Sequence, residues 1–388
     1  MSIRTCPACG GDDIEPLVDL GEVPALCGAM WSDAAGARDA ARGHLDLVVC
    51  PECAHVWNAA FDERLIDYDA DYDNSLHHSS TFQRFADELA GRLAATHDLR
   101  GGYVLEIGSG KGEFLSQLCS LADCEGVGFD PTFTGTSTTP GVELVAEYFP
   151  VGSAPERPFD LLLCRHVLEH LADPVALLTG LVASARATGT RPTFYFEVPS
   201  AAFNFGPAGL WDCIYPHVSY FSMPSLRRLI ERAGLTVVRI EQTFHGQFLS
   251  VEAVAADIPG VSRIEGDDVA AHLTLLGSFA DRLQSTVQEW SARITGQEQS
   301  GDQVALWGAG AKAVVFLNAV DGAGRLRAVV DVNPGKWGRF LPGTGHQVLA
   351  PAALPTDVSA VLVTNAAYLD EITEQLAGLG VHADVLAV

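Results

Sequence analysis

The sequence predicts an α/β protein in which a small cysteine-bearing module is followed by two α/β domains of unequal size. Two Cys-x-x-Cys pairs lie near the N-terminus, and a buried strand followed by a glycine turn and a helix occurs twice, from Tyr103 and from Val304. Each such unit is typical of a parallel sheet covered by helices. The expected boundaries are residues 1–65 for the module, 66–256 for the larger domain, 257–300 for a linking helix and 301–388 for the smaller domain.

The module is defined by Cys6, Cys9, Cys50 and Cys53, with each pair in a Cys-Pro-x-Cys turn. This spacing lets four thiolates meet one tetrahedral Zn²⁺, and because four protein ligands leave no open position we expect the zinc to be structural. Two disulfides or four free thiols are the alternatives. Disulfides need an oxidising compartment, whereas Met1 is followed by no cleavable apolar segment, so we expect a cytoplasmic protein.

Composition narrows the classes of partner. Among 388 residues, 24 Lys and Arg stand against 49 Asp and Glu, a formal net charge of −25 that would repel nucleic acid and anionic membrane surfaces. No apolar run reaches the roughly 20 residues that a membrane helix needs. We therefore expect a soluble protein that acts on a small molecule, and the sequence leaves monomer and homodimer open.

The first glycine turn, Gly108-Ser-Gly-Lys-Gly112, joins a predicted strand, Tyr103–Ile107, to a helix that begins near Glu113. Glycines let a ligand approach the backbone at a helix N-terminus. The next predicted strand, Gly126–Asp130, ends in a carboxylate that can accept both hydroxyls of a ribose. A dinucleotide and S-adenosylmethionine would both suit this turn. The candidate cofactor-binding residues are Glu106, Gly108, Ser109, Gly110, Gly112 and Asp130.

Two further predicted strands favour S-adenosylmethionine over a dinucleotide as the cofactor. Phe159–Cys164 runs into Arg165-His-Val-Leu-Glu-His170, and Thr193–Val198 ends at a proline. Together with the glycine turn, this pattern resembles the class I S-adenosylmethionine-dependent methyltransferases. The resemblance implies a Rossmann-like domain that binds S-adenosylmethionine, and it adds Arg165 and His166 to the cofactor-binding residues.

Over the whole chain, the order of the three parts resembles the antibiotic-sugar C-methyltransferases. The likeness is carried by residues 212–221, which include Tyr215-Pro-His-Val-Ser-Tyr220, and by residues 329–343. That family methylates a carbon beside the keto group of a nucleotide-linked deoxysugar. The resemblance implies that Tyr215 and His217 flank the reacting carbon and that Tyr72 and His166 help to position donor or acceptor.

The chain departs from that family at two places. The sugar enzymes usually read Tyr-x-Glu-His, whereas Tyr215-Pro216-His217 is one residue shorter and lacks the acid. Their Gly-Gly-Ser stretch is replaced by His245-Gly-Gln-Phe-Leu-Ser250. Because both changes fall at the acceptor, methylation of oxygen or nitrogen on another small polar metabolite stays open. So does a protein of another class, a non-catalytic S-adenosylmethionine-binding scaffold.

Histidine suits the chemistry that this resemblance implies. His217, mostly neutral at pH 7, could remove a proton next to a carbonyl, and the hydroxyl of Tyr215 or Tyr220 could stabilise the enolate. The alternative is that these side chains only pack in a loop. We expect His170 to be structural and the adjacent pair His77-His78 to lie in a loop away from the site.

The smaller domain starts with Val304-Ala-Leu-Trp-Gly-Ala-Gly-Ala-Lys312, a second strand and glycine turn. It lacks the third glycine of a dinucleotide fingerprint. The stretch is locally basic in an acidic chain, so we expect it to bind the phosphates of the acceptor through Lys312, Asn333, Lys336 and Arg339. A role in stability or dimerisation is the alternative. Apolar residues from Val269 to Ile294 recur at helical spacing and predict one long helix before this domain.

Overall fold

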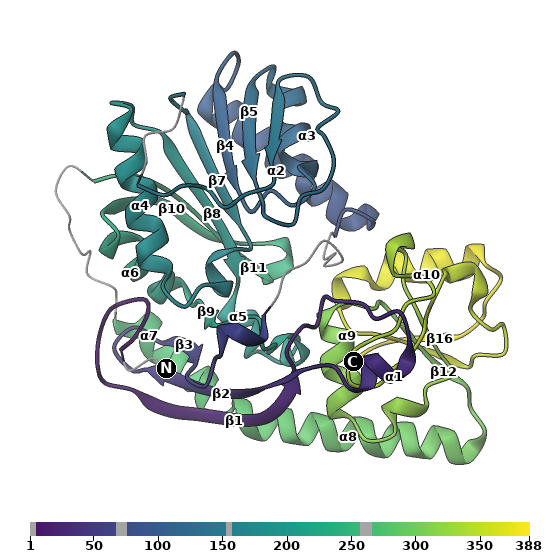
Figure 1. Cartoon of the computed structure of the whole chain (residues 1–388). Coiled ribbons are helices and arrows are strands. Elements are labelled where there is room, and N and C mark those ends of the chain that lie inside the picture. The colour runs from purple at the N-terminus through teal and green to yellow at the C-terminus, as the bar shows by residue number, and fades with distance from the viewer. Residues whose placement is uncertain (1–4, 67–75, 153–156, 257–265) are drawn as a thin grey trace.

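The structure of the protein is a computed structural model that describes residues 5–66, 76–152, 157–256 and 266–388. Within these ranges the strands form three sheets, of four, seven and five strands. Figure 1 shows the seven-stranded sheet at the upper left, the five-stranded sheet at the lower right and the N-terminal strands beneath them. None of the helices in these ranges is long and apolar enough to cross a membrane.

The N-terminal sheet has the order β1-β2-β3-β9 and is antiparallel. Its last strand comes from the middle of the chain, so β1, β2 and β3 share their sheet with the larger domain. Arg232 at the end of helix α6 (Met223–Arg232) also donates to the carbonyl of Pro7 at 3.2 Å. The elements of this sheet region are β1 (Glu15–Pro24), α1 (Ala34–Arg38), β2 (Arg42–Cys50), β3 (His55–Asn58), η1 (Glu63–Leu65) and β9 (Ser219–Tyr220).

The seven-stranded sheet has the order β10-β11-β8-β7-β4-β5-β6, in which β8 to β6 are parallel and the hairpin of β10 and β11 is antiparallel. The four strands predicted from the sequence are β4, β5, β7 and β8, each within two residues of its expected ends. The elements are α2 (Ser80–His97), β4 (Tyr103–Ile107), α3 (Glu113–Ala122), β5 (Glu125–Phe129), β6 (Val142–Val145), β7 (Leu161–Arg165), η2 (Leu168–His170), α4 (Pro174–Ala187), β8 (Thr193–Pro199), α5 (Ala201–Asn204), η3 (Leu210–Asp212), α6, β10 (Leu235–Thr243), η4 (Phe244–Gly246) and β11 (Phe248–Ala255).

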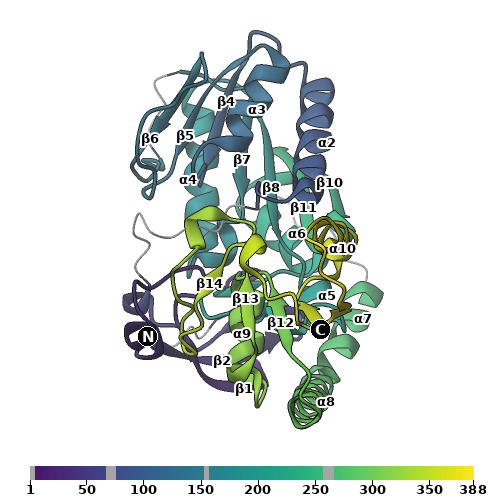
Figure 2. The same cartoon turned by 90° about the vertical axis from the view of Figure 1, so that its right-hand side faces the viewer.

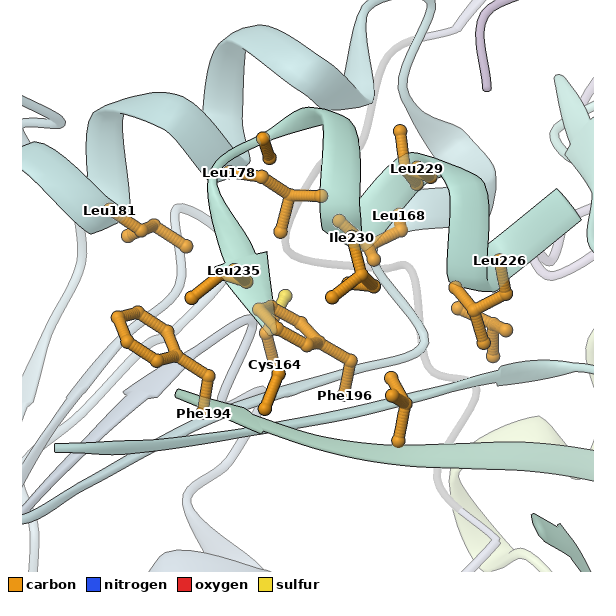
Figure 3. Close-up of a cluster of buried hydrophobic side chains, with 14 of the residues drawn as sticks. Cys164, Leu168, Leu178, Leu181, Phe194, Phe196, Leu226, Leu229, Ile230 and Leu235 are labelled. Carbon is orange, nitrogen blue, oxygen red and sulfur yellow. The ribbon is translucent and has the colours of Figure 1, made fainter. Parts of the chain in front are cut away.

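One face of this sheet is covered by α4 and α6. Figure 3 shows Leu178 of α4 and Ile230 of α6 above Phe194 and Phe196 of β8, and all four side chains are fully buried. The apolar positions of both helices recur at helical spacing, which turns one face of each toward the sheet. Cys6, Cys50 and Cys53 belong to the same apolar cluster. The cysteine module and the larger domain therefore share one core.

The predicted long helix is wrong, because the structure has two helices in its place. They are α7 (Gly266–Gly277) and α8 (Phe279–Ser300), separated by a turn at Ser278. Glycine is a poor helix former, which fits a break after Gly277. Leu276 and Phe279 pack with the β2 and β3 side chains, whereas Ile294 packs with the C-terminal domain. The apolar spacing continues across the break because both helices keep an inward face.

The C-terminal sheet is parallel, with the order β14-β13-β12-β15-β16. Figure 2 shows α10 close to the start of α2, where Glu371 accepts hydrogen bonds from Ser79 Oγ at 2.7 Å and Thr81 N at 3.0 Å. These bonds hold the two α/β domains together. The elements are β12 (Val304–Trp307), α9 (Ala311–Ala319), η5 (Ala323–Arg325), β13 (Ala328–Val330), η6 (Pro334–Lys336), β14 (Val348–Leu349), η7 (Pro351–Ala353), β15 (Ala360–Val363), η8 (Ala366–Tyr368), α10 (Leu369–Gly378) and β16 (Asp384–Ala387).

Candidate active site

A cavity of about 740 Å³ lies between the seven-stranded and the five-stranded sheet. Its walls include Gly108 after β4, His166 after β7, Gly308 after β12 and Asp331 after β13. Both sheets therefore turn the carboxyl ends of their strands toward one space, the place where open α/β sheets bind ligands. The volume falls within the range of about 300–1,000 Å³ that is usual for ligand sites.

The glycine turn after β4 forms one wall. Gly108, Gly110 and Gly112 have φ values of +70°, +55° and +75°, which a residue with a Cβ rarely adopts. A Cβ on Gly108 would lie 2.3 Å from Val167, whereas a Cβ on Gly110 would meet no atom within 4 Å. Gly110 therefore leaves its backbone open to the cavity. The side chain of Ser109 packs against Gly128 of β5, and its backbone lines the same wall.

Two carboxylates flank this turn. Asp130 accepts from the Gly110 amide through Oδ2 at 2.8 Å and from Thr132 N through Oδ1 at 2.8 Å, so it fixes the turn and still has lone pairs for ribose hydroxyls. Glu106 is 3% exposed, and burial raises its pKa to about 7. Its Oε2 has no hydrogen-bond partner within the described residues. An orphaned carboxylate oxygen beside an open glycine fits a cationic nucleoside such as S-adenosylmethionine.

A buried ion cluster adjoins the turn at the ends of β7 and β8. Arg165 donates to Glu197 Oε1 from Nε at 3.0 Å and Nη2 at 2.8 Å, and His166 Nε2 lies 3.2 Å from the same oxygen. Burial opposes the charge of His166, but Glu169 and Glu197 outweigh it and raise the pKa to about 9. His166 is therefore charged at neutral pH. It also has a φ of +56°, the kind of backbone strain that clusters at functional sites.

The acceptor side of the cavity contains His217, which is 9% exposed and has no partner at Nδ1 within the described residues. Burial and the neighbouring His170 lower its pKa to about 4, so it is neutral at pH 7. The rings of His170 and His217 lie 5.1 Å apart, and His170 Nδ1 is 2.9 Å from the carbonyl oxygen of Pro216. His170 thus lines the cavity and also contacts the loop that carries His217, so the structural role expected from the sequence stays a prediction.

The hydroxyl groups of Tyr215 and Tyr220 bind backbone groups and do not face the cavity. Tyr215 Oη accepts from Asp62 N at 2.7 Å, and Tyr220 Oη lies 3.1 Å from both the amide nitrogen and the carbonyl oxygen of Ile214. Neither tyrosine is among the residues that line the cavity. They hold the loop that carries His217, so the structure does not bring them to the enolate position that we expected. Tyr72 lies outside the described residues.

Several cavity residues were not expected from the sequence. His77 and His78 lie in the turn before α2 and line the cavity, although we expected them to be remote. The aromatic side chains of Phe244 and Phe248 form a further wall, and Glu169 of η2 lies next to His166. The sequence carried a positional signal for Glu169 alone, because residues that come soon after a parallel strand such as β7 lie at the ligand edge of the sheet.

The opposite wall belongs to the C-terminal domain. Lys336 is 7% exposed, and its Nζ lies 3.4 Å from Asp331 Oδ2 and 3.2 Å from the carbonyl oxygen of Ala309. Asn333, 3% exposed, has no partner for Nδ2 within the described part of the chain. Lys312 also lines the cavity, with its Nζ 3.3 Å from Asp212. Arg339 does not line it, because its guanidinium donates to the Met30 carbonyl at 3.0 Å.

The four N-terminal cysteines converge away from the cavity. The Sγ atoms of Cys6 and Cys53, and those of Cys9 and Cys50, are 3.6 Å apart, and all four lie within 4.8 Å of one another. A disulfide would require about 2.05 Å. Four sulfurs about 2.3 Å from one tetrahedral ion would be about 3.8 Å apart. The cluster therefore fits a single metal ion far better than two disulfides.

Comparisons with known proteins match this architecture. Residues 77–240 match a family described as a methyltransferase domain, and residues 249–382 match one described as the C-methyltransferase C-terminal domain. The first match includes the glycine turn, Asp130 and the ion cluster. The chain therefore contains a methyltransferase domain, and the protein is an S-adenosylmethionine-dependent methyltransferase.

A curated relative matches most of the chain. The C-methyltransferase NovU of Streptomyces niveus is 27% identical to this protein, covering 90% of this chain and 86% of the relative. Solved structures that resemble the chain include an S-adenosylmethionine-dependent methyltransferase of Aquifex aeolicus, at 16% identity and a TM-score of 0.37 over 49% of this chain and all of that one. The magnesium protoporphyrin IX methyltransferase of Synechocystis is 16% identical, with a TM-score of 0.34 over 45% of this chain and 80% of that one.

The donor site can be tested by calorimetry with S-adenosylhomocysteine. Asp130→Ala should weaken binding about 30-fold, since two hydrogen bonds to a ribose contribute about 2 kcal/mol. Gly110→Val should abolish binding, because its side chain would enter the open space and its φ of +55° is strained for valine. Glu88→Ala, at an exposed helical position on α2 outside the cavity, is the control and should bind normally. Unchanged affinity in both site variants would contradict this placement.

Proposed function

We propose that the protein transfers a methyl group from S-adenosylmethionine to a carbon next to the keto group of a nucleotide-linked deoxysugar, with His217 as the general base. One observation carries the proposal. A single cavity extends from Gly110 on the donor side, past the neutral His217, to Lys336 and Asn333 on the other domain. The donor-binding glycine turn, the proposed base and a lysine of the C-terminal domain therefore line the same cavity. The similarity to a C-methyltransferase supports transfer to carbon.

The chemistry needs few groups from the protein. When bound, S-adenosylmethionine supplies an already activated methyl group, so the chain must orient the acceptor and take one proton. His217 can take that proton because its lowered pKa keeps it neutral. Since the tyrosine hydroxyls are engaged elsewhere, we assign stabilisation of the enolate oxygen to the positive charge of His166, which lines the same cavity.

The C-terminal wall suits the diphosphate of the acceptor. Helix α9 begins at Ala311 with no side-chain cap, and Gly308, Gly310 and Ala311 at its N-terminus line the cavity, where helix amides can bind an anion. The orphaned Asn333 Nδ2 is a second donor, and Lys336 adds a cation. Binding energy from this distant part of the acceptor would hold the reacting carbon beside His217.

Kinetics can test this anchor. Lys336→Ala should raise the KM for the acceptor about tenfold, with a larger effect at low salt, because a cation next to phosphate is lost. Affinity for S-adenosylhomocysteine should not change. Arg339→Ala is the matched control, since Arg339 lies close in sequence but outside the cavity and should leave KM unchanged. If both variants behave alike, the cavity wall around Lys336 does not hold the diphosphate.

The acceptor class can be tested with methyl-labelled S-adenosylmethionine and a panel of nucleotide-linked sugars. Keto sugars should accept label, whereas the matching sugars with a hydroxyl in place of the keto group should not, because only the ketone acidifies the neighbouring C–H bond. Label on the hydroxyl sugars would favour O-methylation instead.

We also propose that Cys6, Cys9, Cys50 and Cys53 hold one structural Zn²⁺. The support is the 3.6 Å spacing of the sulfurs and the burial of three of the four side chains. Four thiolates leave no open coordination position, so this ion would have no direct part in catalysis. Its effect would be on folding, through the core that the module shares with α6.

A further inference from the structure

Glu169 is a buried carboxylate at the acceptor side of the cavity to which sequence motifs assign no role. It lies in η2, is 1% exposed and lines the cavity. Its Oε1 is 3.6 Å from His166 Nδ1, while its Oε2 has no hydrogen-bond partner within the described residues. A buried carboxylate oxygen without a donor is costly, and in a native structure it calls for an explanation.

Glu169 faces the proposed base. An oxygen of Glu169 and one ring nitrogen each of His170 and His217 all lie within 4.8 Å of one another. The Pro216 carbonyl can only accept, so it fixes His170 with the proton on Nδ1. The titratable groups that face His217 are His170, Glu169, Asp212, His166 and Tyr220.

Two of these groups are carboxylates, and only one is available to His217. Asp212 is paired with Lys312 at 3.3 Å, which neutralises much of its field. Glu169 and Glu197 both lie next to the ring of His166, and Glu197 also forms an ion pair with Arg165. When His217 takes a proton, it becomes a cation in a buried site, which is unfavourable without a compensating anion. Glu169 is the carboxylate placed to compensate it.

We propose that Glu169 is a positioning residue that stabilises the protonated form of His217 during proton removal from the acceptor, a role that rests on the proposed C-methylation. The sequence around the base, Tyr215-Pro216-His217, contains no carboxylate. The structure brings one from a different element, η2, which follows β7, the central strand of the seven-stranded sheet. The arrangement is similar to a catalytic triad, in which a third group orients the general base and stabilises its protonated form.

The proposed reaction balances in protons and electrons. The C–H bond next to the keto group breaks, its electron pair forms the enolate and the proton moves to His217. The enolate carbon then forms a bond to the methyl carbon, and the sulfur–methyl electron pair leaves on sulfur as S-adenosylhomocysteine. His217 finally releases its proton to water. Glu169 itself forms and breaks no covalent bond.

The test compares Glu169→Gln with Glu169→Asp. Gln keeps the size but removes the charge, so kcat should fall about 10- to 100-fold with little change in the KM of either substrate. Exchange of the α proton with deuterated solvent should slow in parallel, and the acid limb of the kcat/KM profile should shift to lower pH, because His217 loses an anion that favours its charged form. Asp should recover part of the rate. Glu252→Gln is the matched control, since Glu252 is a buried carboxylate that pairs with Arg92 and His97 away from the cavity.

The outcomes separate this role from the function on which it rests. Wild-type kcat in Glu169→Gln, in an enzyme that does methylate keto sugars, would overturn the role of Glu169 alone. Loss of folding or of S-adenosylhomocysteine affinity in proportion to the loss of kcat would also overturn it in favour of a structural role. So would chelator-sensitive activity restored by a transition metal, since that would make this cluster a metal site. A wild-type enzyme inactive on every keto sugar would instead overturn the proposed function.

Discussion

Replacing His217 by alanine should lower kcat about 10²- to 10⁴-fold, the usual contribution of a general base. Affinity for S-adenosylhomocysteine should stay normal, because His217 lies on the acceptor side of the cavity and not on the glycine turn. In the wild type at saturating S-adenosylmethionine, the part of the kcat/KM profile that depends on His217 should rise with pH through a pKa near 4 and be complete below pH 6.5, since the base works in its neutral form and its pKa is lowered. Steady-state kinetics and calorimetry measure both effects.

A buried histidine outside the cavity controls for packing. His272 on α7 is 8% exposed, and burial lowers its pKa to about 4 as well. It does not line the cavity, so His272→Ala should leave kcat close to that of the wild type. Equal turnover in the wild type and His217→Ala would mean that His217 only packs in its loop.

Replacing Cys50 by serine should remove the metal and unfold more than the module. Metal analysis should find one zinc per wild-type chain and almost none in the variant. Structural zinc sites contribute about 10–16 kcal/mol in small peptides, more than the total stability of most domains. Because Cys50 and Cys53 share an apolar cluster with Leu226 and Leu229 of α6, thermal unfolding of the methyltransferase domain should shift with that of the module.

Cys27→Ser provides the matched control in the same N-terminal region. Cys27 is buried but lies outside the cluster, and its Sγ contacts the Pro24 carbonyl at 3.6 Å, a bond that serine can retain. Its zinc content should equal that of the wild type. Full zinc content in a chain that lacks Cys6, Cys9, Cys50 and Cys53 would contradict the assignment.

Features that depend on local pattern were predictable from the sequence. An apolar strand, three glycines and a carboxylate about twenty residues later place the donor turn, because each step depends on neighbouring residues. The structure accordingly puts Gly108, Gly110 and Asp130 on one wall of the cavity. Cysteine spacing predicted the convergence of the four sulfurs for the same reason.

Features that depend on distant contacts were not predictable. Tyr215 turns its hydroxyl to Asp62, which is 153 residues away in sequence, and Arg339 turns to Met30. Composition shows that a segment is basic but not which cation faces a ligand. The strand β9, which joins the N-terminal sheet, is only two residues long, so it is too short to show an alternation of apolar and polar residues. Such pairings are set by tertiary packing.

The central claim is that this cavity joins a methyl group to an acidified carbon of a keto sugar. The most direct measurement is NMR of the product formed from a nucleotide-linked keto sugar and ¹³C-methyl-labelled S-adenosylmethionine in deuterated water. We predict a ¹³C–¹³C or long-range ¹H–¹³C correlation that places the methyl group on the carbon next to the carbonyl, with solvent deuterium at that carbon in recovered substrate. A methyl signal on oxygen or nitrogen, with no deuterium in the recovered substrate, would contradict it.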